Sequence, residues 1–289
     1  MAERPASASL RQHGLTPRKR LGQNFLRDES VLPRILGAAA LDPDDQVLEI
    51  GAGTGVLTRA LSEAAQRVLA IELDDALYRM LSTAFERVAN VELWHGNALD
   101  LDACAHFSGP YKLIANIPYY ITGPLLRHYL EGECQPLVLV VMVQREVAER
   151  IVAEPGRLSL LGISVQFYAN ARIVSRVARG AFYPVPKVDS AILQLTPYRR
   201  STGSVEERAF FEVARAGFST RRKQLVNALM NGLRIDREEA AGMLAGAEID
   251  ATRRAETLSI TEWERLARAR LQFGEDRMGS RGKGARAGA

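Results

Sequence analysis

The segment NIPYY, Asn116–Tyr120, carries the most specific chemistry in the chain. An amino group conjugated to an aromatic ring is a poor nucleophile, because its lone pair is delocalised. The side-chain oxygen of Asn116 and a nearby main-chain carbonyl can accept the two amino hydrogens, which localises the lone pair for attack on an activated methyl group. Pro118 restricts the backbone, and Tyr119 offers a face on which an extruded base can stack. The motif predicts methylation of a base nitrogen, unless it only ends a strand.

A glycine-rich turn, EIGAGTG at Glu49–Gly55, precedes a helical pattern. Its glycines let the backbone approach a ligand, and the following helix start offers unpaired amides. A dinucleotide fingerprint needs a further glycine where this chain has Val56. Glu72 ends the next apolar run, where a carboxylate can accept both ribose hydroxyls of a nucleoside. The spacing favours a nucleoside ligand, although a tight strand-to-helix connection is the alternative for the glycines alone.

Apolar runs of strand length alternate with helical patterns through the first two thirds of the chain. This alternation predicts a parallel, doubly wound α/β sheet with helices on both faces. Two later β-like runs, Ala171–Val177 and Ser190–Thr196, are expected to close the sheet as an antiparallel pair. The predicted parallel strands are Val47–Ile50, Val68–Leu73, Val91–Trp94, Leu113–Ile117 and Leu137–Val143, and the predicted later helices are Val205–Ala216, Arg221–Leu229, Arg237–Ala245 and Thr261–Phe273.

The composition changes at Pro197 to helical, Arg-rich sequence, where we place a domain boundary. We predict a flexible basic arm at 1–19, a catalytic domain at 20–197, a small helical RNA-binding domain at 198–273 and a disordered basic tail at 274–289. The net charge is +4, yet residues 1–27, 199–234 and 277–289 are strongly basic, so the remainder is acidic. Such asymmetry suits a polyanionic partner, the alternative being solvated tails.

The two cysteines, Cys104 and Cys134, have no CxxC or Cys/His spacing, so we expect free thiols and no zinc site. The histidines are expected to be background residues. Neither a membrane-spanning apolar stretch nor an apolar signal-peptide core stands out, and we therefore expect a cytoplasmic protein without membrane insertion.

Taken together, the glycine turn and Glu72 resemble the cofactor site of Rossmann-like S-adenosylmethionine methyltransferases, which implies a seven-stranded sheet. Gly96–Leu99 then falls where these enzymes contact the cofactor adenine. Asn97 stands in place of their usual Asp, and its amide oxygen can accept a hydrogen bond without contributing charge. The NIPYY segment matches the motif of amino-group methyltransferases, in the Asn form typical of the KsgA and Erm enzymes that modify adenine in RNA.

Three further segments resemble the bacterial KsgA (RsmA) rRNA adenine dimethyltransferases, and this likeness extends from about residue 18 to 273. They are RKRLGQNFL at Arg18–Leu26, AFYPVPKVDSAI at Ala181–Ile192, and FSTRRKQLVNAL at Phe218–Leu229 followed by RAETLS at Arg254–Ser259. Adjacent cations at a helix start oppose the helix dipole, yet they suit a phosphate. The resemblance implies cofactor contacts from Asn24, Leu26, Gly51, Gly53, Glu72, Asn97 and Asn116, base stacking between Tyr119 and Phe182, and RNA contacts from Lys187, Arg221, Arg222 and Lys223.

The resemblance implies dimethylation of two adjacent adenines in a hairpin near the 3′ end of small-subunit rRNA, with S-adenosylmethionine as the cofactor. The expected substrate is an immature 30S particle, the enzyme a monomer without metal, and subunit maturation an associated role. One alternative is an Erm-type enzyme acting on large-subunit rRNA, although the KVDS and RAETLS segments look more like KsgA. Another is an assembly factor that binds small subunits without needing turnover.

Overall fold

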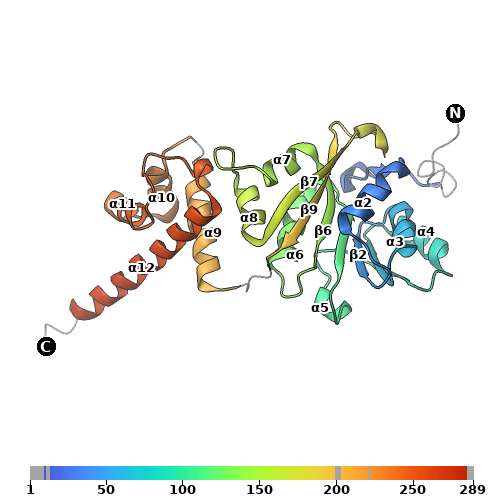
Figure 1. The fold of residues 1–289 in the computed structure, drawn as a ribbon, viewed down its shortest axis with the longest axis horizontal. Coiled ribbons are helices and arrows are strands. Elements are labelled where there is room, and N and C mark those ends of the chain that lie inside the picture. Colours follow the sequence, from blue (N-terminus) through green and yellow to red (C-terminus); the bar gives the residue numbers. More distant parts are fainter. Residues whose placement is uncertain (1–9, 11–13, 199–202, 221, 285–289) are drawn as a thin grey trace. The chain divides into compact units, whose positions relative to one another are not determined.

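A computed structural model describes residue 10 and residues 14–198, 203–220 and 222–284 (Figure 1). The chain divides into two compact units, one formed by residues 1–149 and 168–199 and the other by residues 150–167 and 200–289. The first unit contains the sheet and the second is helical. Residues 150–167, which the sequence places in the first domain, group with the helical unit. The predicted domain boundaries at 197 and 273 otherwise stay predictions.

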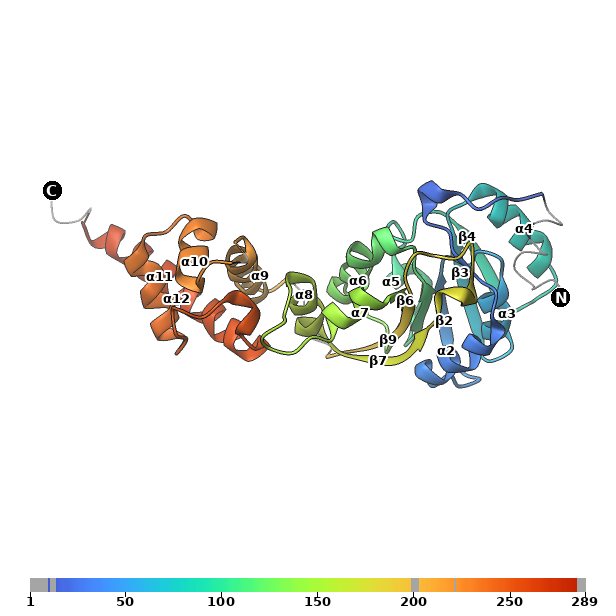
Figure 2. The same ribbon diagram turned by 90° about the horizontal axis from the view of Figure 1, so that it is seen from above.

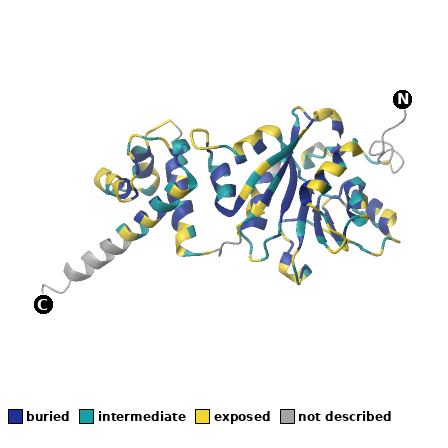
Figure 3. Ribbon diagram, viewed as in Figure 1, coloured by how far each residue is buried: buried dark blue, intermediate teal, exposed yellow. Residues whose placement is uncertain are grey.

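Seven strands form the central sheet in the order β4-β3-β2-β5-β6-β9-β7, and the expected Rossmann-like fold is confirmed. The strands β2 to β6 run parallel, while β9 is antiparallel to both β6 and β7. The inner strands are apolar on both sides because helices cover both faces, and Figure 3 shows them buried. Their bounds are β2 Gln46–Ile50, β3 Arg67–Glu72, β4 Val91–His95, β5 Lys112–Asn116, β6 Leu139–Gln144, β7 Ala169–Val177 and β9 Ser190–Pro197.

Two helices of the first unit begin at residues that favour a helix start. Asp74 caps α4 by accepting hydrogen bonds from the amides of Ala76 and Leu77. Gly55 precedes α3 with φ of +78°, a conformation that favours glycine. Helices α2 and α6 lie on opposite faces of the sheet (Figure 2). The helices are α2 Leu32–Ala39, α3 Val56–Ser62, α4 Asp75–Phe85, α5 Ala103–His106, α6 Thr122–Glu131 and α7 Arg145–Ile151.

A two-stranded ribbon joins the N-terminal segment to the segment that precedes β9. Strand β1, Phe25–Leu26, pairs antiparallel with β8, Phe182–Tyr183. Its register places Leu26 opposite Phe182 and Phe25 opposite Tyr183. The ribbon therefore brings together two motifs that lie far apart in the sequence.

The helical unit packs around Trp263, which is fully buried and stacks on Phe218 with a centroid distance of 5.7 Å. Ser204 and Asp236 cap α9 and α11. No helix in the described part of the chain is long and apolar enough to cross a membrane. The elements of this unit are α8 Leu160–Tyr168, α9 Val205–Phe218, α10 Leu225–Leu233, α11 Arg237–Gly246, the 3-10 turn Ala255–Thr257 and α12 Ile260–Gly284.

Helices α10 and α12 differ from the sequence prediction in their bounds. Helix α10 starts at Leu225 instead of Arg221, because the amides of Leu225 and Val226 donate to the carbonyls of Arg253 and Ala251 and so end the preceding loop there. Arg222 and Lys223 thus lie before the helix, and Arg221 is outside the described residues. Helix α12 continues to Gly284, into the tail expected to be disordered, since glycines inside an established helix cost only about 1 kcal/mol each.

Cys104 and Cys134 form a disulfide, and the expectation of free thiols was wrong. Their Cα atoms are 5.4 Å apart, although 30 positions separate them in the chain. Cys104 belongs to α5 and Cys134 to the loop that follows α6, so the fold joins two segments whose spacing gives no signal. Because these segments lead into β5 and β6, the bridge lies at the edge of the sheet opposite to Asn116.

Candidate functional site

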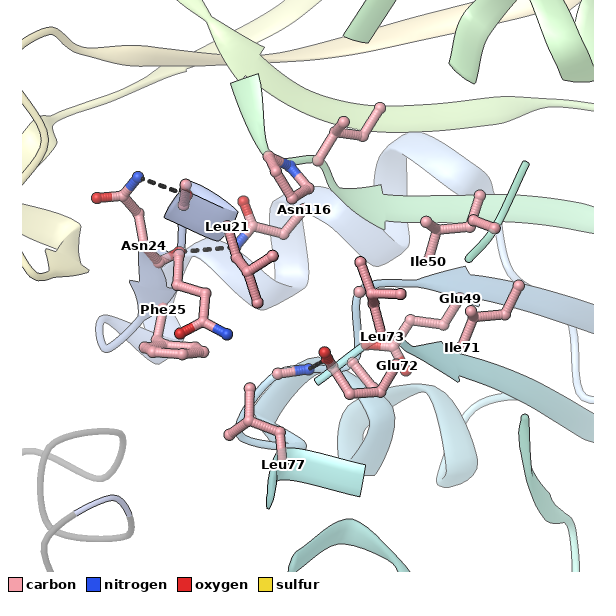
Figure 4. Close-up of a pocket in the computed structure, with 18 of the residues that line it drawn as sticks. Leu21, Asn24, Phe25, Glu49, Ile50, Ile71, Glu72, Leu73, Leu77 and Asn116 are labelled. Atoms are coloured by element: carbon pink, nitrogen blue, oxygen red, sulfur yellow. Dashed lines mark hydrogen bonds between the residues drawn. The ribbon is translucent and has the colours of Figure 1, made fainter. Parts of the chain in front are cut away.

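A pocket opens at the carboxyl ends of β2, β3 and β5, where ligands bind in open α/β sheets. It encloses about 1040 Å³, including its open mouth, and its walls come from the N-terminal segment, the glycine turn and the NIPYY segment (Figure 4). The structure brings nine of the ten predicted catalytic and cofactor residues to this pocket. They are Asn24, Leu26, Gly51, Gly53, Glu72, Asn97, Asn116, Pro118 and Tyr119.

Glu72 holds the glycine turn in place. Its Oε2 accepts from the amide of Gly53 at 2.9 Å and its Oε1 accepts from the amide of Asp74 at 2.8 Å. Burial raises the pKa of Glu72, and the two amides oppose that shift. Each carboxylate oxygen has two lone pairs, so both can still accept a hydrogen bond from a ligand.

The glycine turn presents backbone to the pocket. Gly51 and Gly53 have φ of +77° and +59°, which side chains beyond glycine rarely adopt. A Cβ atom on Gly53 would lie 3.1 Å from the Phe25 ring. Because a side chain at Gly53 would crowd this ring, the glycine turn presents main-chain atoms to the pocket.

Glu49 is a pocket residue that sequence reasoning missed. It is only 1% exposed, and neither carboxyl oxygen has a hydrogen-bond partner among the described residues. Burial, aided by the nearby charge of Glu72, raises the pKa of Glu49 to about 8. The Thr58 hydroxyl is near enough to oppose this shift but lies outside hydrogen-bonding geometry. An acidic residue inside the apolar strand VLEI was the available signal.

Asn116 is oriented by the N-terminal segment. Its Nδ2 donates to the main-chain carbonyl of Asn24 at 3.1 Å (Figure 4), and Asn24 in turn donates through its own Nδ2 to the Gly22 carbonyl at 3.0 Å. Because its amide nitrogen is engaged, Asn116 keeps Oδ1 available as an acceptor. The site can therefore accept a hydrogen from an amino group at the end of β5.

Asn97 also lines the pocket, just after the end of β4. Its Oδ1 accepts from the amide of Leu99 at 3.2 Å, which closes a local turn. Tyr129 supports the same loop by donating to the Ala98 carbonyl at 2.8 Å. One lone pair of Oδ1 thus remains for a ligand.

Phe182 is the exception among the predicted catalytic residues. Its side chain is fully buried in the core and does not line the pocket. Successive residues of a strand face opposite sides, so the ribbon turns Phe182 inward and leaves the adjacent Tyr183 37% exposed. Tyr119, by contrast, is half-buried at the pocket wall.

The three predicted RNA contacts that the structure describes lie outside the pocket. Lys187 is exposed in the first unit, and its carbonyl accepts from the Arg179 side chain at 3.5 Å. Arg222 and Lys223 are exposed in the second unit. In the neighbouring loop Arg253 instead pairs with Glu262 and lowers the pKa of that carboxyl to about 2.

The family profile and the similar proteins all concern the methylation of ribosomal RNA. The profile of the family described as "Ribosomal RNA adenine dimethylase" matches residues 14–265. Proteins named "Ribosomal RNA small subunit methyltransferase A" are similar along nearly their whole length. The one from Dehalococcoides mccartyi is 47% identical over 90% of this chain and 91% of its own, and the one from Pelotomaculum thermopropionicum is 42% identical over 92% and 95%.

Two solved structures share the fold at lower identity. A dimethyladenosine transferase from Plasmodium falciparum superposes with a TM-score of 0.73 at 28% identity, covering 87% of this chain and 98% of that one. The 23S rRNA methyltransferase ErmE gives a TM-score of 0.68 at 27% identity, with 85% and 99% covered.

Proposed function

The chain belongs to the ribosomal RNA adenine dimethylase family, and from this premise we propose that it dimethylates two adjacent adenines in a hairpin near the 3′ end of small-subunit rRNA. The chain is an adenine dimethyltransferase that acts on small-subunit rRNA. The observation that carries the proposal is the oriented amide of Asn116, whose nitrogen is held by the Asn24 carbonyl and whose oxygen is left for an amino hydrogen.

The pocket fits S-adenosylmethionine, which when bound supplies a methyl group activated by a positively charged sulfur. Main-chain atoms of Gly51 and Gly53 form the wall that a side chain would obstruct. Glu72 would hold the ribose and Asn97 the adenine, while Asn24 and Leu26 would cover the ligand. The carboxyl of Glu49 has no hydrogen-bond partner among the described residues, and a cationic ligand would favour its ionised form.

Asn116 and Tyr119 would act on the base. The Oδ1 of Asn116 and a nearby main-chain carbonyl, such as that of Ile117, would accept the two amino hydrogens and localise the nitrogen lone pair. Pro118 fixes the backbone between them. After transfer the methylated nitrogen is strongly acidic, and water takes its proton, so the side chains need supply no general base.

The base would stack on Tyr119, which lies on the pocket wall. The role predicted for Phe182 would require its ring, buried in the core, to turn toward the pocket. A change in the β1–β8 ribbon on RNA binding would be needed for that step.

Basic side chains of both domains would contact rRNA phosphates, which supply most of the affinity in such complexes. We assign this role to Lys187 in the catalytic domain and to Arg221, Arg222 and Lys223 in the helical domain at 198–273. The proposed substrate is an immature 30S particle in the cytoplasm, bound by a monomer that uses no metal.

Tritiated methyl transfer to unmethylated small subunits tests the proposal. Nucleoside analysis after digestion is expected to give N6,N6-dimethyladenosine, and Asn116→Ala is expected to lose at least about 100-fold in rate, as for loss of a group aimed at developing charge. Failure to label small subunits, or full activity of the variant, would refute it.

Two controls separate the alternatives. Large subunits labelled in parallel would reveal an Erm-type substrate, which the 40 to 47% identity to small-subunit enzymes disfavours. For an assembly factor, Asn116→Ala would abolish methylation yet leave subunit binding and maturation intact.

A further inference from the structure

Ser190 is a polar residue inside an apolar strand. It begins β9, pairs with Gln144 of β6 and Val177 of β7, and is fully buried. The next residues along the strand, Ala191–Leu193, are fully buried as well. A buried hydroxyl is costly without a hydrogen-bond partner. Within the described residues the Ser190 hydroxyl has one such partner, the hydroxyl of Tyr119 at 2.8 Å.

Tyr119 is thus held through its main chain and through its hydroxyl. Its main-chain carbonyl accepts from the Oγ1 of the buried Thr122 at 3.2 Å, and its hydroxyl meets Ser190. Two other tyrosines differ: the side chains of Tyr111 and Tyr129 are buried, only 2 to 3% exposed, and their hydroxyls donate to main-chain carbonyls. Tyr119 is the one of the three that lines the pocket, so its hydrogen bond fixes a ring that faces a ligand site.

We propose that Ser190 is a positioning residue, which holds the Tyr119 ring in the plane required for stacking before the target base arrives. This inference rests on the proposed function, in which Tyr119 contacts the base. Ser190 itself does not line the pocket and therefore acts through Tyr119. A ring that is already fixed loses less side-chain freedom on binding, and pre-organisation of this kind favours the stacked complex.

The test compares Ser190→Ala, Tyr119→Phe and the double variant in methyl transfer to unmethylated small subunits. Each single change removes the same hydrogen bond and keeps an aromatic ring at position 119. We expect kcat/KM for the subunit to fall about threefold to tenfold in each single variant, as for one net hydrogen bond. The kcat/KM of the double variant is expected to be no lower than that of the less active single variant, because both changes remove the same interaction.

Ser175→Ala is the matched control. Ser175 lies in β7 of the same sheet, and its buried Oγ has no hydrogen-bond partner among the described residues. Its activity is expected to match the unmodified enzyme. S-adenosylmethionine affinity, measured by calorimetry, is expected to stay unchanged in Ser190→Ala, which separates base positioning from a general loosening of the pocket.

Full kcat/KM in Ser190→Ala or in Tyr119→Phe would overturn the inference, as would losses that multiply in the double variant or a weakened cofactor affinity. If Ser190→Ala fails to fold, Tyr119→Phe alone decides, because it removes the hydrogen bond and leaves Ser190 in the strand. An unmodified enzyme that makes no dimethyladenosine would refute the proposed function instead.

Discussion

Replacing Glu49 by Gln is expected to stabilise the cofactor-free protein at alkaline pH. The pKa of this carboxyl is about 8 in the fold, against an ordinary value of 4.5, because burial disfavours its charge. An acid whose pKa is raised by folding stabilises the protein fully below pH 4.5, and that contribution is lost as the pH rises toward 8. Gln has the same shape without a charge, so it escapes the loss.

The size of the effect follows from linkage. Each pKa unit corresponds to about 1.4 kcal/mol, so the variant is expected to exceed the unmodified protein in unfolding free energy by about 4 kcal/mol at pH 8 and by less than about 1 kcal/mol at pH 5. Because Glu49 is only 1% exposed, solvent screening reduces this value little. Guanidinium unfolding followed by circular dichroism at both pH values measures the two differences.

Glu63→Gln serves as the control, since Glu63 is exposed at the end of α3. The unfolding free energy of the Glu63→Gln variant is expected to differ from that of the unmodified protein by the same small amount at pH 5 and at pH 8. A Glu49→Gln difference that does not grow between pH 5 and pH 8 would refute the reasoning. So would a variant that is less stable at pH 8.

Three other expectations concern the cofactor, the RNA and the disulfide. Asn97→Asp adds an anionic acceptor and is expected to tighten S-adenosylmethionine binding about threefold to tenfold in calorimetry; unchanged or weaker binding would contradict the adenine contact. Replacing Arg222 and Lys223 together by Ala is expected to weaken rRNA binding and to reduce the slope of log affinity against log salt by about 1 to 2, and an unaltered slope would exclude phosphate contacts. Reducing the Cys104–Cys134 bridge is expected to lower the unfolding free energy by up to about 4 kcal/mol for a loop of this length; a Tm indifferent to reductant would mean that no bridge forms.

The pocket could be predicted from the sequence because the carboxyl ends of neighbouring parallel strands lie on the same side of the sheet. Glu72 and Asn116 each end a strand, and the carboxyl ends of β3, β2 and β5 share one edge of the sheet. Two residues separated widely in the chain are then neighbours by topology alone. The same argument gave the glycine turn, since it follows β2 directly.

Phe182 could not be placed in this way. Aromatic residues stand at both 182 and 183, and the one that faces the core depends on the pairing of β8 with a strand near the N-terminus. A shift of one residue in that register would exchange the two faces. The sequence around the motif contains no signal for this pairing.

Glu49 and the cysteines show a second limit. The apolar neighbours of Glu49 indicate burial, yet whether a carboxyl finds a partner depends on helices that pack over the strand. The contact between α5 and the loop after α6 likewise arises from the assembled sheet. Spacing rules describe neighbours along the chain, and these neighbours exist only in the fold.

Under the proposed function, the hydrogen bond from Asn116 to the Asn24 carbonyl would make the N-terminal segment part of the reaction centre as well as a cover for it. If residues 22–26 lift away to admit or release a nucleoside, the carboxamide loses its anchor and is free to flip. The motion that opens the pocket would then also release the Asn116 side chain, so the open form would be inactive.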